Sequence, residues 1–262
     1  MTNPTLGKWR NPPLAYVVAE IVIAPLYDIA ASIPGIQKGL RSDYPRTLEG
    51  NEVTIESSGP PIVNQVWRLL SADQSRGVFV GTRSISLHST HYLDSHEFLE
   101  SWDGVLKVIE EVHLSAFVER IGLRYVDLIV PSEGRSPSDY VDDGVRGVRP
   151  SSQEVLLNSI WAGSFSSEGF TIGARVGAPS PPGMLLPPNF NALPLHKPPV
   201  WVAAEKEVLS NHQIGFVDTD CTAEIKELFS APQIGARFRA AKTQISDMFE
   251  RLTSDFAKGE WK

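Results

Sequence analysis

Cysteine is almost absent from this chain. Cys221 is the single cysteine among 262 residues, so no intramolecular disulfide can form, and such a composition suits a reducing compartment. Long apolar runs are missing too, because no stretch approaches the roughly 18 apolar residues of a membrane span. The apolar run 14–26 contains Glu20, is closed by Pro25 and precedes no small-residue cleavage pattern, so we interpret it as a strand rather than a signal peptide. These absences predict a cytoplasmic protein with no membrane partner.

An excess of positive charge is also lacking. Acidic residues outnumber lysine and arginine by 31 to 24, for a formal net charge of −7, which argues against a protein that coats nucleic acid. A modest basic patch falls on the last predicted helix, at Arg237, Arg239, Lys242 and Arg251. It has no interleaved aromatic residues of the kind that stack on bases. Nucleic acid is therefore disfavoured as a partner.

Signatures of catalysis and of cofactor binding are missing. The chain has no G-x-S-x-G elbow and no glycine-rich phosphate loop. Cys221 has no histidine near it in sequence, which is typical of a core cysteine. His88, His91, Asp94 and His96 are ligand types for zinc, but a strand end that turns into a helix points such side chains in different directions. We expect no metal and no cofactor, assign no catalytic residue, and leave enzymatic activity open.

The longest β-like run, residues 117–130, carries charges among apolar residues. In a strand, alternate residues point to opposite faces, so Arg120 and Arg124 share one face with Gly122, while Ile121 and Leu123 lie on the other. Both faces contain apolar residues, which is typical of a strand inside a sheet. Since buried charge needs partners, this strand predicts acids or an extended ligand opposite its arginines.

The first 131 residues predict a compact α+β unit. Strands are expected at 16–24, 52–57, 63–70, 77–88 and 117–130. Residues 26–40 have near-helical apolar spacing that Pro34-Gly35 should break or kink. A second helix should begin after Asp94, which forms a capping box with Glu97.

The remaining chain predicts a second β-rich half. Residues 132–150, rich in Gly, Ser, Pro and Asp, form the expected linker, and residues 151–262 the second half. Strands are expected at 155–162, 169–177, 200–209 and 213–223, followed by an amphipathic helix from about Ile234. Residues 179–199 contain eight prolines and form an arm that either packs over its own domain or binds a partner. The apolar residues of this arm are Met184, Leu185, Leu186 and Phe190. The predicted fold is α+β, with two β-rich halves of mainly antiparallel sheet, each covered by helices.

Several segments together resemble a known family. They are the proline-led first strand with Glu20, the segment 120–125 (R-I-G-L-R-Y), the strand 215–220 (G-F-V-D-T-D) and the final helix segment 245–253. The likeness is to a sporadically distributed prokaryotic family of uncharacterised proteins of about 250–270 residues, and spans nearly the whole chain. It implies a shared fold and leaves the activity open. The chain departs from the family pattern at residues 95–98, where a tryptophan-containing segment is usual, and in the longer arm 179–199.

The strongest polar constellation is Arg120 and Arg124 with Asp218 and Asp220. The two aspartates share a face of their strand about 7 Å apart, and arginine binds carboxylates with bidentate geometry. These residues, together with Glu20, form either an ion-pair network between neighbouring sheets of the two halves or a cleft for an acidic or phosphate-bearing ligand.

Two functions follow from these patterns. The leading hypothesis is a non-enzymatic interaction or regulatory protein that binds the product of an adjacent gene through the arm and the last helix. The patchy distribution of the family suggests a phage-defence or toxin–antitoxin setting, and a homodimer is compatible with the apolar last helix. The alternative is a ligand-sensing or hydrolytic protein with a charged cleft for a small acidic molecule or nucleic acid.

Overall fold

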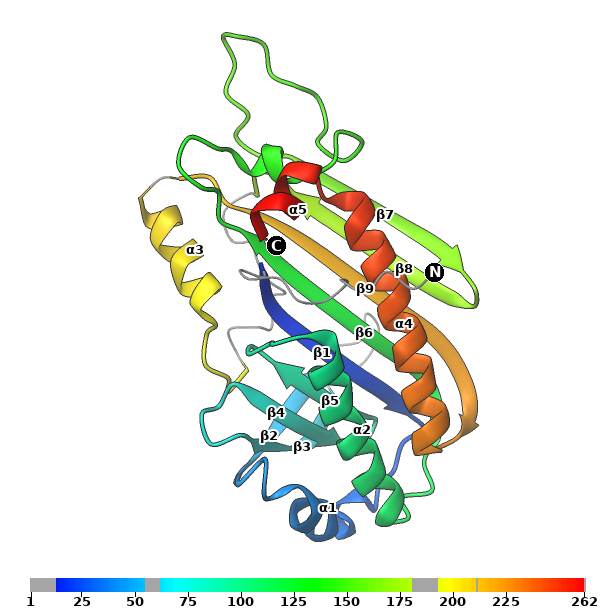
Figure 1. Ribbon diagram of the computed structural model, residues 1–262. Helices are drawn as coiled ribbons and strands as arrows, with labels where there is room; N and C mark the ends of the chain where they lie inside the picture. Colours follow the sequence, from blue (N-terminus) through cyan, green and yellow to red (C-terminus); the bar gives the residue numbers. More distant parts are fainter. Residues whose placement is uncertain (1–12, 55–61, 181–192, 211, 262) are drawn as a thin grey trace.

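The computed structural model describes residues 13–54, 62–180, 193–210 and 212–261. The described residues form one nine-stranded antiparallel sheet packed with five α-helices, which confirms the α+β class (Figure 1). The strands follow the order β2-β3-β4-β5-β1-β6-β9-β8-β7 across the sheet. Their bounds are β1 Leu14–Ile23, β2 Arg46–Thr54, β3 Ile62–Leu70, β4 Arg76–Gly81, β5 Ser84–Ser89, β6 Phe117–Ile129, β7 Ile160–Ser167, β8 Phe170–Gly177 and β9 Gly215–Leu228. The helices are α1 Ile33–Leu40, α2 Ser95–Glu111, α3 Pro199–Leu209, α4 Ala231–Leu252 and α5 Asp255–Trp261.

The expectation of two halves with their own sheets is wrong. Strand β6 of the first half pairs with β9 of the second along nearly its whole length, from Phe117 opposite Leu228 to Ile129 opposite Gly215. A strand that is apolar on both faces needs a neighbour on each side, and β6 finds them in β1 and β9. The sheet is therefore continuous through the middle of the molecule. The expected boundary at 132–150 stays a prediction; this stretch contains a short 3₁₀ helix, Pro137–Tyr140.

The two parts of the chain nevertheless repeat a plan within the one sheet. β1 opens a series of strands whose last member, β5, pairs back with β1, and helix α2 follows. β6 opens a second series whose last member, β9, pairs back with β6, and helix α4 follows. Because β1 and β6 are themselves paired antiparallel, the two series join at the centre of the sheet.

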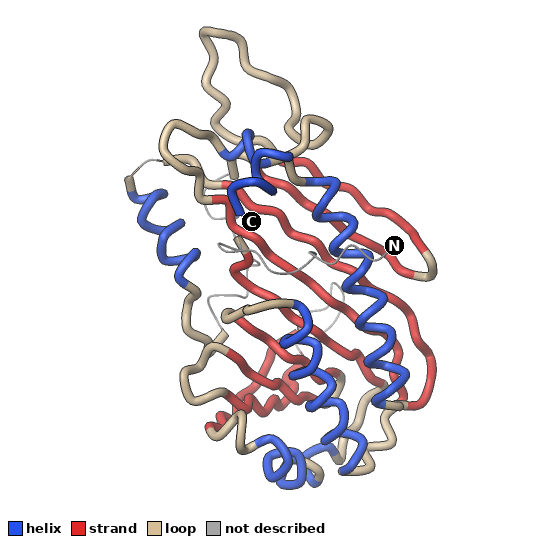
Figure 2. The backbone as a smooth tube through the Cα atoms, viewed as in Figure 1, coloured by secondary structure: helices blue, strands red, loops and turns tan. Residues whose placement is uncertain are grey.

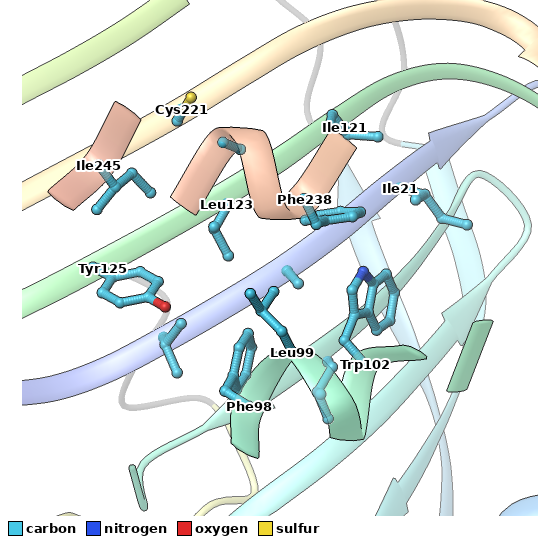
Figure 3. Close-up of a cluster of buried hydrophobic side chains, with 14 of the residues drawn as sticks. Ile21, Phe98, Leu99, Trp102, Ile121, Leu123, Tyr125, Cys221, Phe238 and Ile245 are labelled. Atoms are coloured by element: carbon cyan, nitrogen blue, oxygen red, sulfur yellow. The ribbon is translucent and has the colours of Figure 1, made fainter. Parts of the chain in front are cut away.

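Helices α2 and α4 lie side by side on one face of the sheet (Figures 1 and 2). The apolar stripe of each helix is buried there, as the spacing predicted; from α4 it contributes Ile234, Phe238, Ala241, Ile245, Met248 and Leu252. Figure 3 shows Phe98 and Trp102 of α2 in one buried cluster with Ile21, Ile121 and Leu123 of the central strands. The last long helix thus covers the sheet of its own chain. Of the predicted capping box of α2, the Asp94 half is present, since Asp94 accepts hydrogen bonds from the backbone of His96 and Glu97. The Glu97 side chain pairs with Arg76 instead.

Strand β6 follows the predicted alternation over most of its length. Ile121, Leu123 and Tyr125 belong to the helix-covered core, whereas Arg120 and Arg124 line a cleft with residues of the opposite face. Val118 departs from the pattern: it is fully buried in the main core, next to a register shift between Val118 and Arg120. An irregular register of this kind turns a side chain to the other face.

Three predicted elements are wrong in type or extent. Residues 200–209, expected as a strand, form helix α3, because Pro199 stands in its first turn and the run from Ala203 to Glu207 favours a helix over the β-branched valines. Residues 77–88 are two strands with a turn at Thr82-Arg83. The side chains that reach the main core fall on even positions before the turn, at 78 and 80, and on odd positions after it, at 85 and 87. The strand expected at 155–162 begins only at Ile160.

Smaller features follow the sequence more closely. The apolar stretch 26–40 is divided as Pro34-Gly35 suggested, into a 3₁₀ turn at Ile29–Ala31 and helix α1, with Pro34 in the first turn of the helix. Among the described residues, no helix combines the length and apolarity needed to cross a membrane.

Candidate functional site

The face of the sheet opposite α2 and α4 carries a charged hollow, which we name the sheet cleft. Its volume is about 450 Å³, and its polar lining comes from four adjacent strands: Glu20 and Tyr16 of β1, His88 of β5, Arg120 and Arg124 of β6, and Asp220 of β9. A second hollow of about 470 Å³ adjoins it over β8 and β7, and Arg124 and Asp220 line both. Together the two hollows extend across the central strands of this face.

Asp218 is the most buried acid of this face, and it binds two arginines. Its carboxylate accepts hydrogen bonds from Arg124 Nε at 2.8 Å and Nη2 at 2.7 Å. From the other side, Arg175 Nε and Nη2 reach the same carboxylate at 3.1 Å and 2.5 Å. The Asp218 side chain is only 5% exposed, against 28% for Arg124 and 43% for Arg175. A buried acid thus fixes two guanidiniums whose remaining N–H groups stay accessible.

Asp220 stands two residues further along the same face and is bonded differently. It lies opposite Arg124 on β6 and Gly173 on β8. Within the described part of the chain, no side chain or backbone group makes a hydrogen bond or ion pair with its carboxylate. Desolvation raises the pKa of Asp220, and the nearby Asp218 raises it further, while Arg124 opposes both effects.

Arg120 pairs with the first strand of the chain rather than with an aspartate. Its Nη2 lies 3.5 Å from Glu20 Oε2, and the two side chains are 46% and 35% exposed. An exposed ion pair at this distance contributes little to stability. Most of the guanidinium donors of Arg120 therefore remain available to a molecule in the cleft.

A hydrogen-bonded chain of neutral groups forms the other end of the cleft. His88 Nδ1 lies 2.6 Å from the Tyr16 hydroxyl, and His88 Nε2 lies 2.7 Å from the Ser86 hydroxyl. Burial, together with the positive charge of Arg68, lowers the pKa of His88 to about 3, so the imidazole is neutral near pH 7. Burial also raises the pKa of Tyr16. A neutral imidazole has one donor and one acceptor nitrogen, so one of the two hydroxyls donates to the ring and the other accepts from it.

The predicted binding residues of the strands come together on one face. Glu20, Arg120, Arg124, Asp218 and Asp220 lie on three consecutive strands, β1, β6 and β9, rather than in neighbouring sheets as expected. Within this constellation, Arg124 pairs with Asp218 and Arg120 pairs with Glu20. Met184, Leu185, Leu186 and Phe190 lie outside the described residues. The predicted binding role of all these residues stays a prediction.

Sequence reasoning missed two parts of the site. Arg175 is the second partner of Asp218, and the alternation of residues 170–177 placed it on a polar face without indicating a neighbour. The Tyr16–His88–Ser86 chain joins strands that are far apart in sequence, so no local spacing signalled it. Ser86 and His88 do show the i, i+2 spacing of two residues on one face of a strand.

The other candidate clusters have ordinary structural roles. His96 lies beside Glu100, His88 binds Tyr16, and no group of three potential metal ligands gathers in the described ranges. Cys221 is fully buried in the core. Of the basic residues on α4, Arg239 pairs with Asp103 and Arg251 lies over Phe165.

No family model, no curated protein and no solved structure matches the chain. The resemblance carried by the segments around Glu20, Arg120 and Asp218 therefore stays a prediction. The described residues define a single-sheet α+β protein with a charged cleft on one face of the sheet.

Proposed function

We propose that this protein binds a small acidic molecule in the sheet cleft and acts through binding rather than catalysis. The observation that carries the proposal is the Arg124–Asp218–Arg175 arrangement, in which a buried acid holds two guanidiniums in place. Each guanidinium uses only its Nε and Nη2 atoms for this contact, so Nη1 remains as a donor toward the hollows. Arginines positioned in this way are suited to bind carboxylate or phosphate oxygens.

The charge balance of the cleft supports an anionic ligand. Across the whole chain, acids exceed bases by seven, yet the two hollows contain three arginines, at 120, 124 and 175, against three acids, at 20, 218 and 220. A cleft that is locally neutral or positive within an acidic protein attracts anions where the rest of the surface repels them.

Thermal unfolding with inorganic phosphate and with glutarate tests the proposal. We expect either anion to raise the Tm of the wild-type chain in a concentration-dependent manner. The same titration should fail with Gly122→Val, because Gly122 forms the floor between the two arginines, and a Cβ there meets only Thr222 Cγ2 at 3.7 Å. The Gly122→Val protein should fold normally, and the valine side chain should fill the space between the arginines.

Arg149→Gln is the matched control, since Arg149 is 71% exposed and does not line either hollow. It should respond to both anions as the wild-type chain does. Equal responses of the wild-type and Gly122→Val proteins would place anion binding elsewhere and reject the cleft.

A protein partner is a second candidate function, favoured by strand β7. This edge strand has neither charge nor proline in its sequence IWAGSFSS, and it exposes Ile160 and Phe165, whereas the opposite edge, β2, contains Arg46, Glu49 and Glu52. Uncharged edges are able to accept a further strand. A partner encoded by an adjacent gene, as in the defence or toxin–antitoxin setting, would add such a strand. The corresponding test is co-purification of that gene product, which should be lost with Ala162→Lys and retained with Ser42→Lys.

A further inference from the structure

Asp218 and Asp220 share one face of β9 but differ in their bonding. Asp218 receives four guanidinium hydrogen bonds and is almost fully buried. Asp220 lines both hollows, and in the described ranges it has no hydrogen-bond or ion-pair partner. The first aspartate therefore supports the arginines, while the second presents its carboxylate to whatever enters the cleft.

The surroundings of Asp220 leave room for a ligand. Its neighbour on β8 is Gly173, where an added Cβ would find no atom closer than the Asp220 carbonyl oxygen at 3.9 Å. On β6 the glycine at 122 leaves similar space, with Thr222 Cγ2 at 3.7 Å as its nearest contact. Two positions without side chains thus flank the carboxylate, and a ligand is able to approach over bare backbone.

The arginine opposite Asp220 does not neutralise it by direct contact. Arg124 is the register partner of Asp220, and side chains directly opposite each other on antiparallel strands have Cβ atoms about 5 Å apart. Arg124 nevertheless directs its Nε and Nη2 atoms to Asp218. The cleft therefore presents an unpaired carboxylate and an accessible guanidinium edge side by side, a few ångströms apart.

We propose that the ligand of the sheet cleft carries a protonated amine next to its acidic group, with Asp220 accepting a hydrogen bond from the amine and Arg124 binding the anion. This inference rests on the proposed function and specifies its ligand class. A partly desolvated carboxylate is stabilised by an ammonium donor, and an acid without an amine would instead bring two negative groups together. The site therefore selects amino acids over the corresponding simple acids.

Glutamate and glutarate form the probe pair, because they differ only in the amine. Isothermal titration should give the wild-type chain a Kd for glutamate roughly tenfold below that for glutarate, the factor that about 1.4 kcal/mol provides. In Asp220→Asn the preference should disappear, with glutamate weakened and glutarate unchanged or bound more tightly. Asp143→Asn, a substitution at an aspartate that is 67% exposed and does not line the cleft, should keep the wild-type ratio.

Each outcome has a distinct meaning. Binding of both probes with equal Kd, or a preference that survives Asp220→Asn, overturns the inference and leaves the proposed function intact. Absence of binding for phosphate, glutarate and glutamate alike rejects the proposed function itself. Far-ultraviolet circular dichroism and the Tm check that Asp220→Asn folds, and Asp220→Ser provides a second variant that also removes the charge.

Discussion

Arg124 and Asp218 form a two-point contact, with Nε bound to Oδ1 at 2.8 Å and Nη2 bound to Oδ2 at 2.7 Å. The pair joins β6 to β9, and Arg175 extends it to β8. These three strands belong to both sequence halves of the molecule, so one carboxylate links segments that begin far apart in the chain. The contact joins the strands and also fixes the positions of two arginines that line the hollows.

Replacing Asp218 should destabilise the fold measurably. Asp218→Ala leaves two guanidiniums without their carboxylate, and breaking a buried pair costs about 3–5 kcal/mol. Because Arg124 and Arg175 keep some access to water, we expect the lower end, about 3 kcal/mol. For a chain of this length that free energy corresponds to a Tm lower by roughly 6–12 °C, measured by calorimetry.

Asp143→Ala is the control for this substitution. Asp143 also contacts two arginines, at 146 and 149, but its side chain is 67% exposed, and exposed pairs contribute less than about 1 kcal/mol. If the two variants had the same Tm, the Asp218 network would contribute no more to stability than an exposed ion pair does.

The sequence allowed Arg124 and Asp218 to be placed in one polar constellation, because alternation assigned the faces and buried charge required a partner, but it did not indicate which arginine contacts which aspartate. It did not allow the single sheet to be predicted, since the pairing of β6 with β9 depends on tertiary contacts that no local pattern records. Helix α3 was missed because three valines outweighed the proline and the helix-forming residues around Ala204. Arg175 was missed because its importance depends on which strand lies beside it.

His88 should make the protein sensitive to acid. Its pKa is about 3 in the fold and about 6.5 in an unfolded chain, so below pH 6.5 the unfolded state binds a proton that the folded state excludes. The contribution of neutral His88 is complete above pH 6.5 and is lost as the pH falls toward 3, at up to about 1.4 kcal/mol per pH unit. Urea unfolding between pH 7 and pH 4.5 measures this slope.

In His88→Gln the slope should become shallower, because no group at this position titrates, even though the free energy of unfolding at pH 7 is lower. His96→Gln removes an imidazole that is 77% exposed and should leave the slope nearly unchanged. Identical slopes in the wild-type protein and His88→Gln would show that His88 is not neutral in the fold.

Trp102 and Phe238 should couple α2 to α4. Their rings meet edge to face at 5.4 Å and 82°, and both side chains are fully buried. Trp102→Ala or Phe238→Ala should cost about 3–5 kcal/mol each, with a coupling of about 1 kcal/mol in a double-mutant cycle. Trp102→Phe should cost far less, because Trp102 Nε1 has no hydrogen-bond partner among the described residues. Leu209→Ala, at a side chain that is 85% exposed, is the neutral reference, and strictly additive losses would contradict direct contact.

Replacing the buried Asp127 by asparagine should stabilise the protein. This side chain is buried on β6, and desolvation together with the charge of Asp218 raises its pKa well above the usual range. A raised folded pKa gives a stability contribution that is present below the unfolded value, near 3.9, and is lost as the pH rises through the folded value. Asp127→Asn keeps the shape of the neutral acid without a group that ionises, so its free energy of unfolding should exceed the wild-type value at pH 7. Near pH 4 the two proteins should converge. Glu119→Gln, at an exposed position of the same strand, should show no such pH-dependent difference from the wild-type protein. A loss of stability in Asp127→Asn at pH 7 would mean that the folded protein holds Asp127 as a paired anion.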